Sequence, residues 1–79
     1  MRVIKEFALS PAIKGTFFSW NGKYIVKLES GNLEQVYKVS ETEIGGLEAL
    51  EIWVFSPEFI SGVQRQFESM DACMDPLFD

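Results

Sequence analysis

Apolar and polar side chains alternate along the first part of the chain, in short runs separated by turn signals. The strongest of these signals is Asn21-Gly22, because both residues tolerate the positive φ angles of a type I′ turn. Residues rich in Phe, Trp, Tyr, Ile and Val flank it on both sides. The pattern predicts a hairpin that pairs Ile13–Trp20 with Lys23–Ser30.

Two further runs extend this hairpin. A second tight turn at Gly31-Asn32 returns the chain as Leu33–Ser40. The opening run, Arg2–Leu9, is also extended, and Ser10-Pro11 ends it because proline cannot donate to a strand ladder. The first forty residues are therefore predicted to form a four-stranded antiparallel meander.

Helical spacing replaces this alternation in the second half of the chain. Ser56-Pro57-Glu58 has the N-cap, N1 proline and first-turn acid of a helix start. Apolar residues then recur on one helical face, namely Phe59, Ile60, Val63, Phe67, Met70 and Met74. Asp75-Pro76 is expected to end this helix, because proline lacks the amide hydrogen that continues one.

The segment Leu47–Phe55 carries two opposing signals. Its first five residues are strong helix formers that follow Gly45-Gly46, whereas Ile-Trp-Val-Phe favours a strand. We predict a short helix, with a fifth strand as the alternative. The fold class is then α+β: a four-stranded antiparallel meander with two C-terminal helices packed on one face, or alternatively five strands and one C-terminal helix. The chain has 79 residues, and one domain over 1–79 is expected.

The Asn21-Gly22 turn also predicts which side chains share a sheet face, because residues opposite each other in a hairpin point the same way. One face is expected to seat the helices and carries Phe17, Tyr24, Val26, Leu28, Tyr37 and Val39. The other carries Lys14, Thr16, Phe18, Trp20, Lys23, Ile25, Lys27, Val36 and Lys38. Lysines are expected on a sheet face that no helix covers, but the aromatic residues among them call for an explanation.

This second face is the candidate binding surface. The residues expected to bind are Lys14, Phe18, Trp20, Lys23, Ile25, Lys27 and Lys38. Aromatic rings offer flat contact area, and lysines attract an anionic partner. A structural interpretation competes with this one, in which the same neighbours simply stabilise the sheet across strands. We expect a protein partner or a second copy of the chain.

Charge divides the sequence into two unlike halves. Residues 1–40 carry six Lys/Arg against three acids, and residues 41–79 carry one against nine, for a net charge of −5. A second hypothesis is therefore an acidic decoy that binds a basic partner. Its acidic residues are Glu41, Glu43, Glu48, Glu51 and Glu58. Single-stranded nucleic acid is a third, weaker hypothesis, because the net charge opposes phosphate binding and the candidate face has no arginine.

The sequence offers little for catalysis. It contains no histidine, which excludes imidazole bases and histidine metal ligands. The one cysteine, Cys73, lies close in sequence to Asp71 and Asp75, which disfavour a thiolate, and we expect a semi-buried structural thiol. The acids match no EF-hand spacing. We therefore expect a non-catalytic protein that needs no metal and no cofactor.

Two features bear on location. The N-terminal residues alternate charged and apolar side chains, unlike the apolar stretch of a secretory signal. The longest apolar run, Ile52–Phe55, is far too short to span a bilayer. A cytoplasmic protein without a membrane partner is the expectation.

Overall fold

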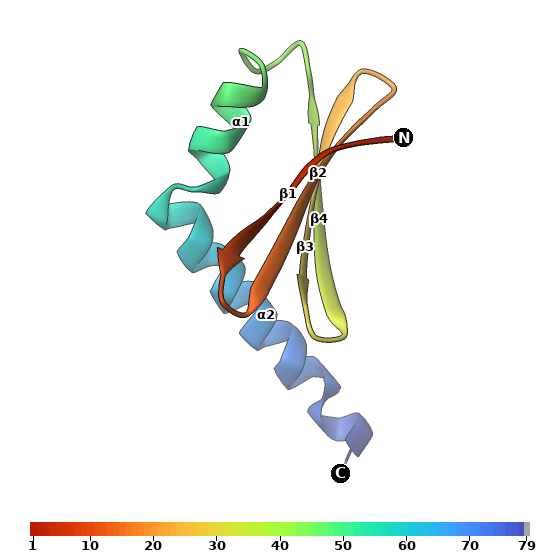
Figure 1. Ribbon diagram of the computed structural model, residues 1–79. Coiled ribbons are helices and arrows are strands. Elements are labelled where there is room, and N and C mark those ends of the chain that lie inside the picture. The colour runs from red at the N-terminus through yellow and green to blue at the C-terminus, as the bar shows by residue number, and fades with distance from the viewer. Residues whose placement is uncertain (79) are drawn as a thin grey trace.

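The computed structural model describes residues 1–78. It has four antiparallel strands in one open sheet of order β1-β2-β3-β4, followed by two helices, which confirms the α+β prediction. The elements are β1 (Arg2–Ser10), β2 (Ile13–Trp20), β3 (Lys23–Ser30), β4 (Leu33–Ser40), α1 (Leu47–Val54) and α2 (Pro57–Phe78). Both helices cover the same face of the sheet and leave the other face open (Figure 1). Because residues 47–54 are helical, the alternative with a fifth strand is wrong.

The turns set the register that the sequence predicts. Asn21 and Gly22 have φ angles of 57° and 77°, as a type I′ turn requires. Trp20 consequently lies opposite Lys23, and the pairing continues without a shift as far as Lys14 and Glu29. Gly31, with φ 59°, turns the chain into β4. Each strand therefore presents alternate side chains to opposite faces.

The core lies between the sheet and the helices. The sheet contributes Phe17, Val26 and Leu28, each fully buried. The helices contribute Leu50 and Val54 from α1 and Val63 and Phe67 from α2. Phe67 is 6% exposed, so its predicted place in the core is confirmed. Tyr24, Tyr37 and Val39 are partly buried at the margin of this core.

A glycine in β2 allows β1 to join the core. Gly15 lies opposite Phe7, whose ring crosses the backbone of β2 and packs on Phe17 with ring centroids 4.5 Å apart. The same ring meets Phe55, which follows α1, edge to face at 5.3 Å. A Cβ atom at position 15 would overlap the Phe7 ring. Glycine is thus required here by a close side-chain approach.

One buried polar side chain ties β4 to α2. The Gln35 amide is almost fully buried, and its Nε2 donates to the main-chain carbonyl of Val63 at 3.1 Å. The hydroxyl of Tyr37 donates to the Oε1 of Gln35. Both polar ends of the amide are therefore satisfied without water. This arrangement fixes where α2 crosses the sheet.

Helix α2 is longer than predicted. It continues through Pro76 to Phe78, so the expected stop at Asp75-Pro76 is wrong. A proline close to a helix end removes one intrahelical hydrogen bond and leaves few later turns to disturb. At 22 residues the helix is about 33 Å long, and its C-terminal end passes beyond the turn between β3 and β4 (Figure 1). Leu77 and Phe78 are each 75% exposed there.

Candidate binding surface

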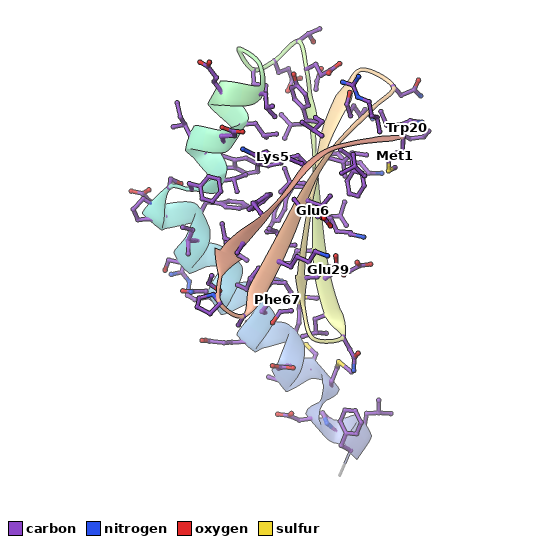
Figure 2. The ribbon with its side chains drawn as sticks, in the orientation of Figure 1. Met1, Lys5, Glu6, Trp20, Glu29 and Phe67 are labelled. Atoms are coloured by element: carbon purple, nitrogen blue, oxygen red, sulfur yellow. The ribbon has the colours of Figure 1, made fainter. Side chains whose placement is uncertain are left out.

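We call the sheet face opposite the helices the outer face. The strand register places on it all seven residues that the sequence singled out, namely Lys14, Phe18, Trp20, Lys23, Ile25, Lys27 and Lys38. Trp20 and Glu29 lie on the side of the sheet away from α1 and α2 (Figure 2). The seven residues therefore share one surface, although they come from three strands.

Strand β1 enlarges this surface in a way the sequence did not indicate. Val3 lies opposite Phe18, and Glu6 lies opposite Thr16, so both point to the outer face. The register of β1 shifts between Val3 and Lys5, as at a β-bulge. A bulge changes the phase of alternation, and counting from a turn cannot place residues beyond one. Lys5 instead points to the helices, where its Nζ lies 2.7 Å from Glu51 Oε1 (Figure 2).

One end of the outer face neutralises its own charges. Lys14 Nζ lies 3.2 Å from Glu6 Oε1, and Lys27 Nζ lies 3.7 Å from Glu29 Oε1. These ion pairs use two of the four lysines that the sequence suggested for an anionic partner. The outer face as a whole carries these four lysines and three glutamates, Glu6, Glu29 and Glu34. Its net charge is therefore one positive charge. Its attraction for anions is therefore local rather than general.

The opposite end of the outer face is apolar and keeps its lysines free. We call Val3, Phe18, Trp20 and Lys23 the Trp20 patch. Val3 is 55% exposed and Trp20 is 48% exposed, while Phe18 between them is half-buried. Neither Lys23 nor the neighbouring Lys38 has an ion-pair partner among residues 1–78. Flat apolar area and uncompensated positive charge thus meet at the same end of the sheet.

Some residues of the outer face are buried by packing between neighbouring strands. Ile25 and Thr16 are each only 5% exposed although no helix covers them. The long side chains of neighbouring strands shield them, and Lys27 Nζ lies 5.7 Å from the centroid of the Phe18 ring. Part of the apolar content of the outer face therefore serves the sheet itself. The part that remains open to a partner is Val3, Trp20 and Val36.

The acidic residues of the second half do not gather into one site. Glu51 is paired with Lys5, and Glu41 accepts a hydrogen bond from the Ser19 hydroxyl at 3.4 Å. No group of three or more metal-ligating side chains is found within residues 1–78. Glu43, Glu48 and Glu58 are exposed and have no ion-pair partner in that range. The negative charge is spread over both helices and the segment that joins β4 to α1.

Cys73 is exposed, so the expectation of a semi-buried thiol is wrong. The residue lies in the last part of α2, where the helix leaves the sheet and has little to pack against (Figure 1). The nearby Asp71 and Asp75, on which the expectation for Cys73 depended, bear on the charge of the thiol and give no information on how far the sheet extends beneath the helix.

A small apolar hollow lies between β4 and α1. It has a volume of about 310 Å³ and is lined by Val39, Ile44, Leu50 and Trp53. The Trp53 ring covers one side of it and packs edge to face on Tyr37 at 5.9 Å. No charged side chain lines the hollow, and it is separate from the Trp20 patch.

The comparisons with known proteins add no relative. Neither protein-family models nor curated proteins nor solved structures give a match to this chain. Among residues 1–78, no helix combines the length and the apolar character needed to cross a membrane. Functional inference therefore depends on the surface itself.

Proposed function

We propose that this chain is a non-catalytic protein-interaction module, and that its Trp20 patch binds a short partner segment carrying acidic and apolar side chains. The main observation in support of this proposal is the difference in charge pairing between the two ends of the outer face. One end pairs its lysines with glutamates on the same face. The other leaves Lys23, which lies opposite the exposed Trp20, without an ion-pair partner among residues 1–78.

The physical properties of the patch favour this type of ligand. Trp is among the residues most enriched at the centres of protein interfaces, because it buries much area at little conformational cost. Trp20 stands on a strand next to a tight turn, and Phe18 and Ile25 hold the backbone beneath it by cross-strand packing. A ligand carboxylate gains most beside a lysine that has no competing partner.

The size of the face favours a short segment over a large globular surface. Four strands of about eight residues span roughly 19 by 26 Å, or about 500 Å². A standard protein–protein interface buries about 800 Å² on each partner. Binding through the Trp20 patch alone is therefore expected to be weak and reversible, which suits a module that recognises a peptide.

Selection from a random peptide library displayed on phage tests this proposal. We expect the selected peptides to combine Asp or Glu with aromatic or aliphatic residues. Their affinity can be followed by the fluorescence of Trp20 in a Trp53→Phe background, which removes the other tryptophan. Trp20→Ala, measured with labelled peptide, should weaken binding at least about tenfold, the usual loss for a central interface tryptophan.

Matched charge variants separate the two ends of the outer face. Lys23→Gln should weaken peptide binding and reduce its salt dependence. Lys14→Gln removes the same charge at the self-neutralised end and should leave the affinity unchanged. If both variants behave alike, or if Trp20→Ala binds the peptides normally, the Trp20 patch is not the binding site.

The same selection distinguishes the other hypotheses. Basic peptides whose binding is lost in Glu43→Gln and Glu48→Gln would favour the acidic decoy. A single-stranded oligonucleotide that competes with the peptides and binds more tightly than they do would favour nucleic acid. Either result would overturn the proposal for the Trp20 patch.

A further inference from the structure

Strand β4 has a free and regular backbone edge. Glu41 N donates to Gly22 O at 3.0 Å, which fixes the phase of the β3–β4 ladder. With this phase, Leu33, Gln35, Tyr37 and Val39 bond to β3, and the residues between them point their amides and carbonyls away from it. Within residues 1–78, no hydrogen bond reaches the main-chain groups of Glu34, Val36 or Lys38 from beyond this edge.

The other edge of the sheet is different. Strand β1 has two register shifts in its pairing with β2, one after Val3 and one after Ala8. Such bulges twist an edge away from straight pairing and protect it from other chains. The pairing of β4 with β3 runs from Ser40 to Leu33 without a shift. Only β4 therefore offers a straight template for another strand.

The side chains on this edge are self-complementary. Glu34, Val36 and Lys38 follow one another on the outer face of β4, so the charge changes sign across Val36. If two β4 strands pair antiparallel about Val36, each Glu34 lies opposite Lys38 of the other copy, and the two Val36 side chains meet. Neither Glu34 nor Lys38 has an ion-pair partner among residues 1–78, and Val36 is 50% exposed.

We infer that β4 pairs with β4 of a second copy, in an antiparallel register centred on Val36, to give a two-fold dimer with a continuous eight-stranded sheet. The three outward residues of each strand supply about six main-chain hydrogen bonds across this edge. Two Glu34–Lys38 ion pairs and one Val36 contact fix the register. A two-fold axis brings the same patch of both copies together, as an isologous interface requires.

Neighbouring registers are less favourable. A pairing centred on Glu34 brings two glutamates together, and one centred on Lys38 brings two lysines together, both of which oppose association. The intermediate registers, centred between Glu34 and Val36 or between Val36 and Lys38, place Glu34 or Lys38 opposite an apolar or neutral side chain. The register about Val36 is the one that satisfies both charges and also overlaps the two strands along most of their length.

This dimer is independent of the proposed peptide binding. The Trp20 patch lies on β1, β2 and β3, and the inferred contact uses β4. Pairing at β4 places two outer faces side by side, with Lys23 of each Trp20 patch still free. Lys38 then serves the dimer, and Lys23 supplies the positive charge beside Trp20.

Sedimentation of charge-swapped variants tests the inference. The wild-type chain should dimerise reversibly between micromolar and millimolar concentration. Glu34→Lys and Lys38→Glu should each weaken dimerisation at least about tenfold, because each places like charges opposite one another twice. A mixture of the two variants should associate again, since a β4 edge with two lysines then faces a β4 edge with two glutamates. The double variant Glu34→Lys/Lys38→Glu should also recover dimerisation.

Two further variants control the experiment. Lys14→Glu makes the same charge change as Lys38→Glu on β2 and should leave the dimer intact. Val36→Pro removes the central amide hydrogen from the free edge but none that bonds β3, so it should abolish dimerisation while circular dichroism shows a folded chain. A wild-type monomer at all concentrations would overturn the inference. So would a dimer that tolerates both Val36→Pro and the single charge changes, or a mixture of the two charge variants that stays monomeric.

Discussion

The inner and outer faces of the sheet differ in burial, although they are built from alternate residues of the same strands. On the inner face, Phe17, Val26 and Leu28 are fully buried beneath the helices. On the outer face, Trp20 and Val36 are about half exposed. The main core therefore lies on the inner face, whereas the outer face combines buried residues such as Ile25 with exposed ones that can contact other molecules.

The largest expected loss of stability comes from a substitution in the core on the inner face. Phe67→Ala removes a ring that is 6% exposed and joins α2 to the sheet. Deleting a buried Phe side chain costs about 3–5 kcal/mol, comparable with the whole stability of a domain of this size. Urea denaturation followed by circular dichroism measures the loss.

Phe78→Ala is the matched control on the same helix. Its ring is 75% exposed, and we expect a change within about 0.5 kcal/mol. Equal losses in the two variants would mean that α2 is not anchored to the sheet through Phe67.

The second effect concerns the glycine beneath Phe7. Gly15→Ala places a methyl group where the Phe7 ring lies and should cost about 1–3 kcal/mol, as overpacking usually does. Phe7→Leu combined with Gly15→Ala should cost less than the sum of the two single variants, because the smaller side chain leaves room for the methyl group. Additive losses would show that the close approach of Phe7 does not cause the loss of stability in Gly15→Ala.

The third effect tests the outer face directly. Phe18 is half-buried, and Phe18→Ala should cost about 1 kcal/mol, well below Phe67→Ala. Chemical denaturation of both variants in the same buffer gives the comparison. A greater loss from Phe18→Ala would mean that the outer face, and not the helix-covered face, holds the main core.

The smallest effect comes from the self-neutralised end of the outer face. The Lys14 and Glu6 side chains are 61% and 62% exposed at a separation of 3.2 Å. Exposed ion pairs contribute about 0–1 kcal/mol, and Lys14→Gln should lower stability by no more than about 0.5 kcal/mol. A larger loss that disappears in high salt would show that this pair is worth more than its exposure suggests.

Local sequence signals predicted the four-stranded meander and which side chains share each face of its hairpins. Asn21-Gly22 fixes a two-residue turn, and the register then follows from counting along strands that have no bulge. The short helix at Leu47–Val54 was also predicted from helix propensity near its start. In each case the decisive interaction lies within a few residues of the chain.

Two contacts of β1 with distant parts of the chain were not predicted. The bulge after Val3 places Lys5 toward Glu51, and the sequence between these residues gives no sign of that meeting. The pairing of Lys14 with Glu6 likewise required the register of β1. The candidate site was therefore predicted as a set of residues on one face, but the division of that face into a neutralised end and a free end was not.

The overhang of α2 divides one continuous helix into two thermodynamic regions. Near Val63 and Phe67 the helix is held by the core, so its amide hydrogens should exchange with solvent only when the whole chain unfolds. The side chains of residues 75–78 are exposed, and Pro76 lacks the amide that would bond back to Ala72. Those last residues should open and close by fraying alone, within seconds of transfer to deuterated water and without any change in the remainder of the molecule.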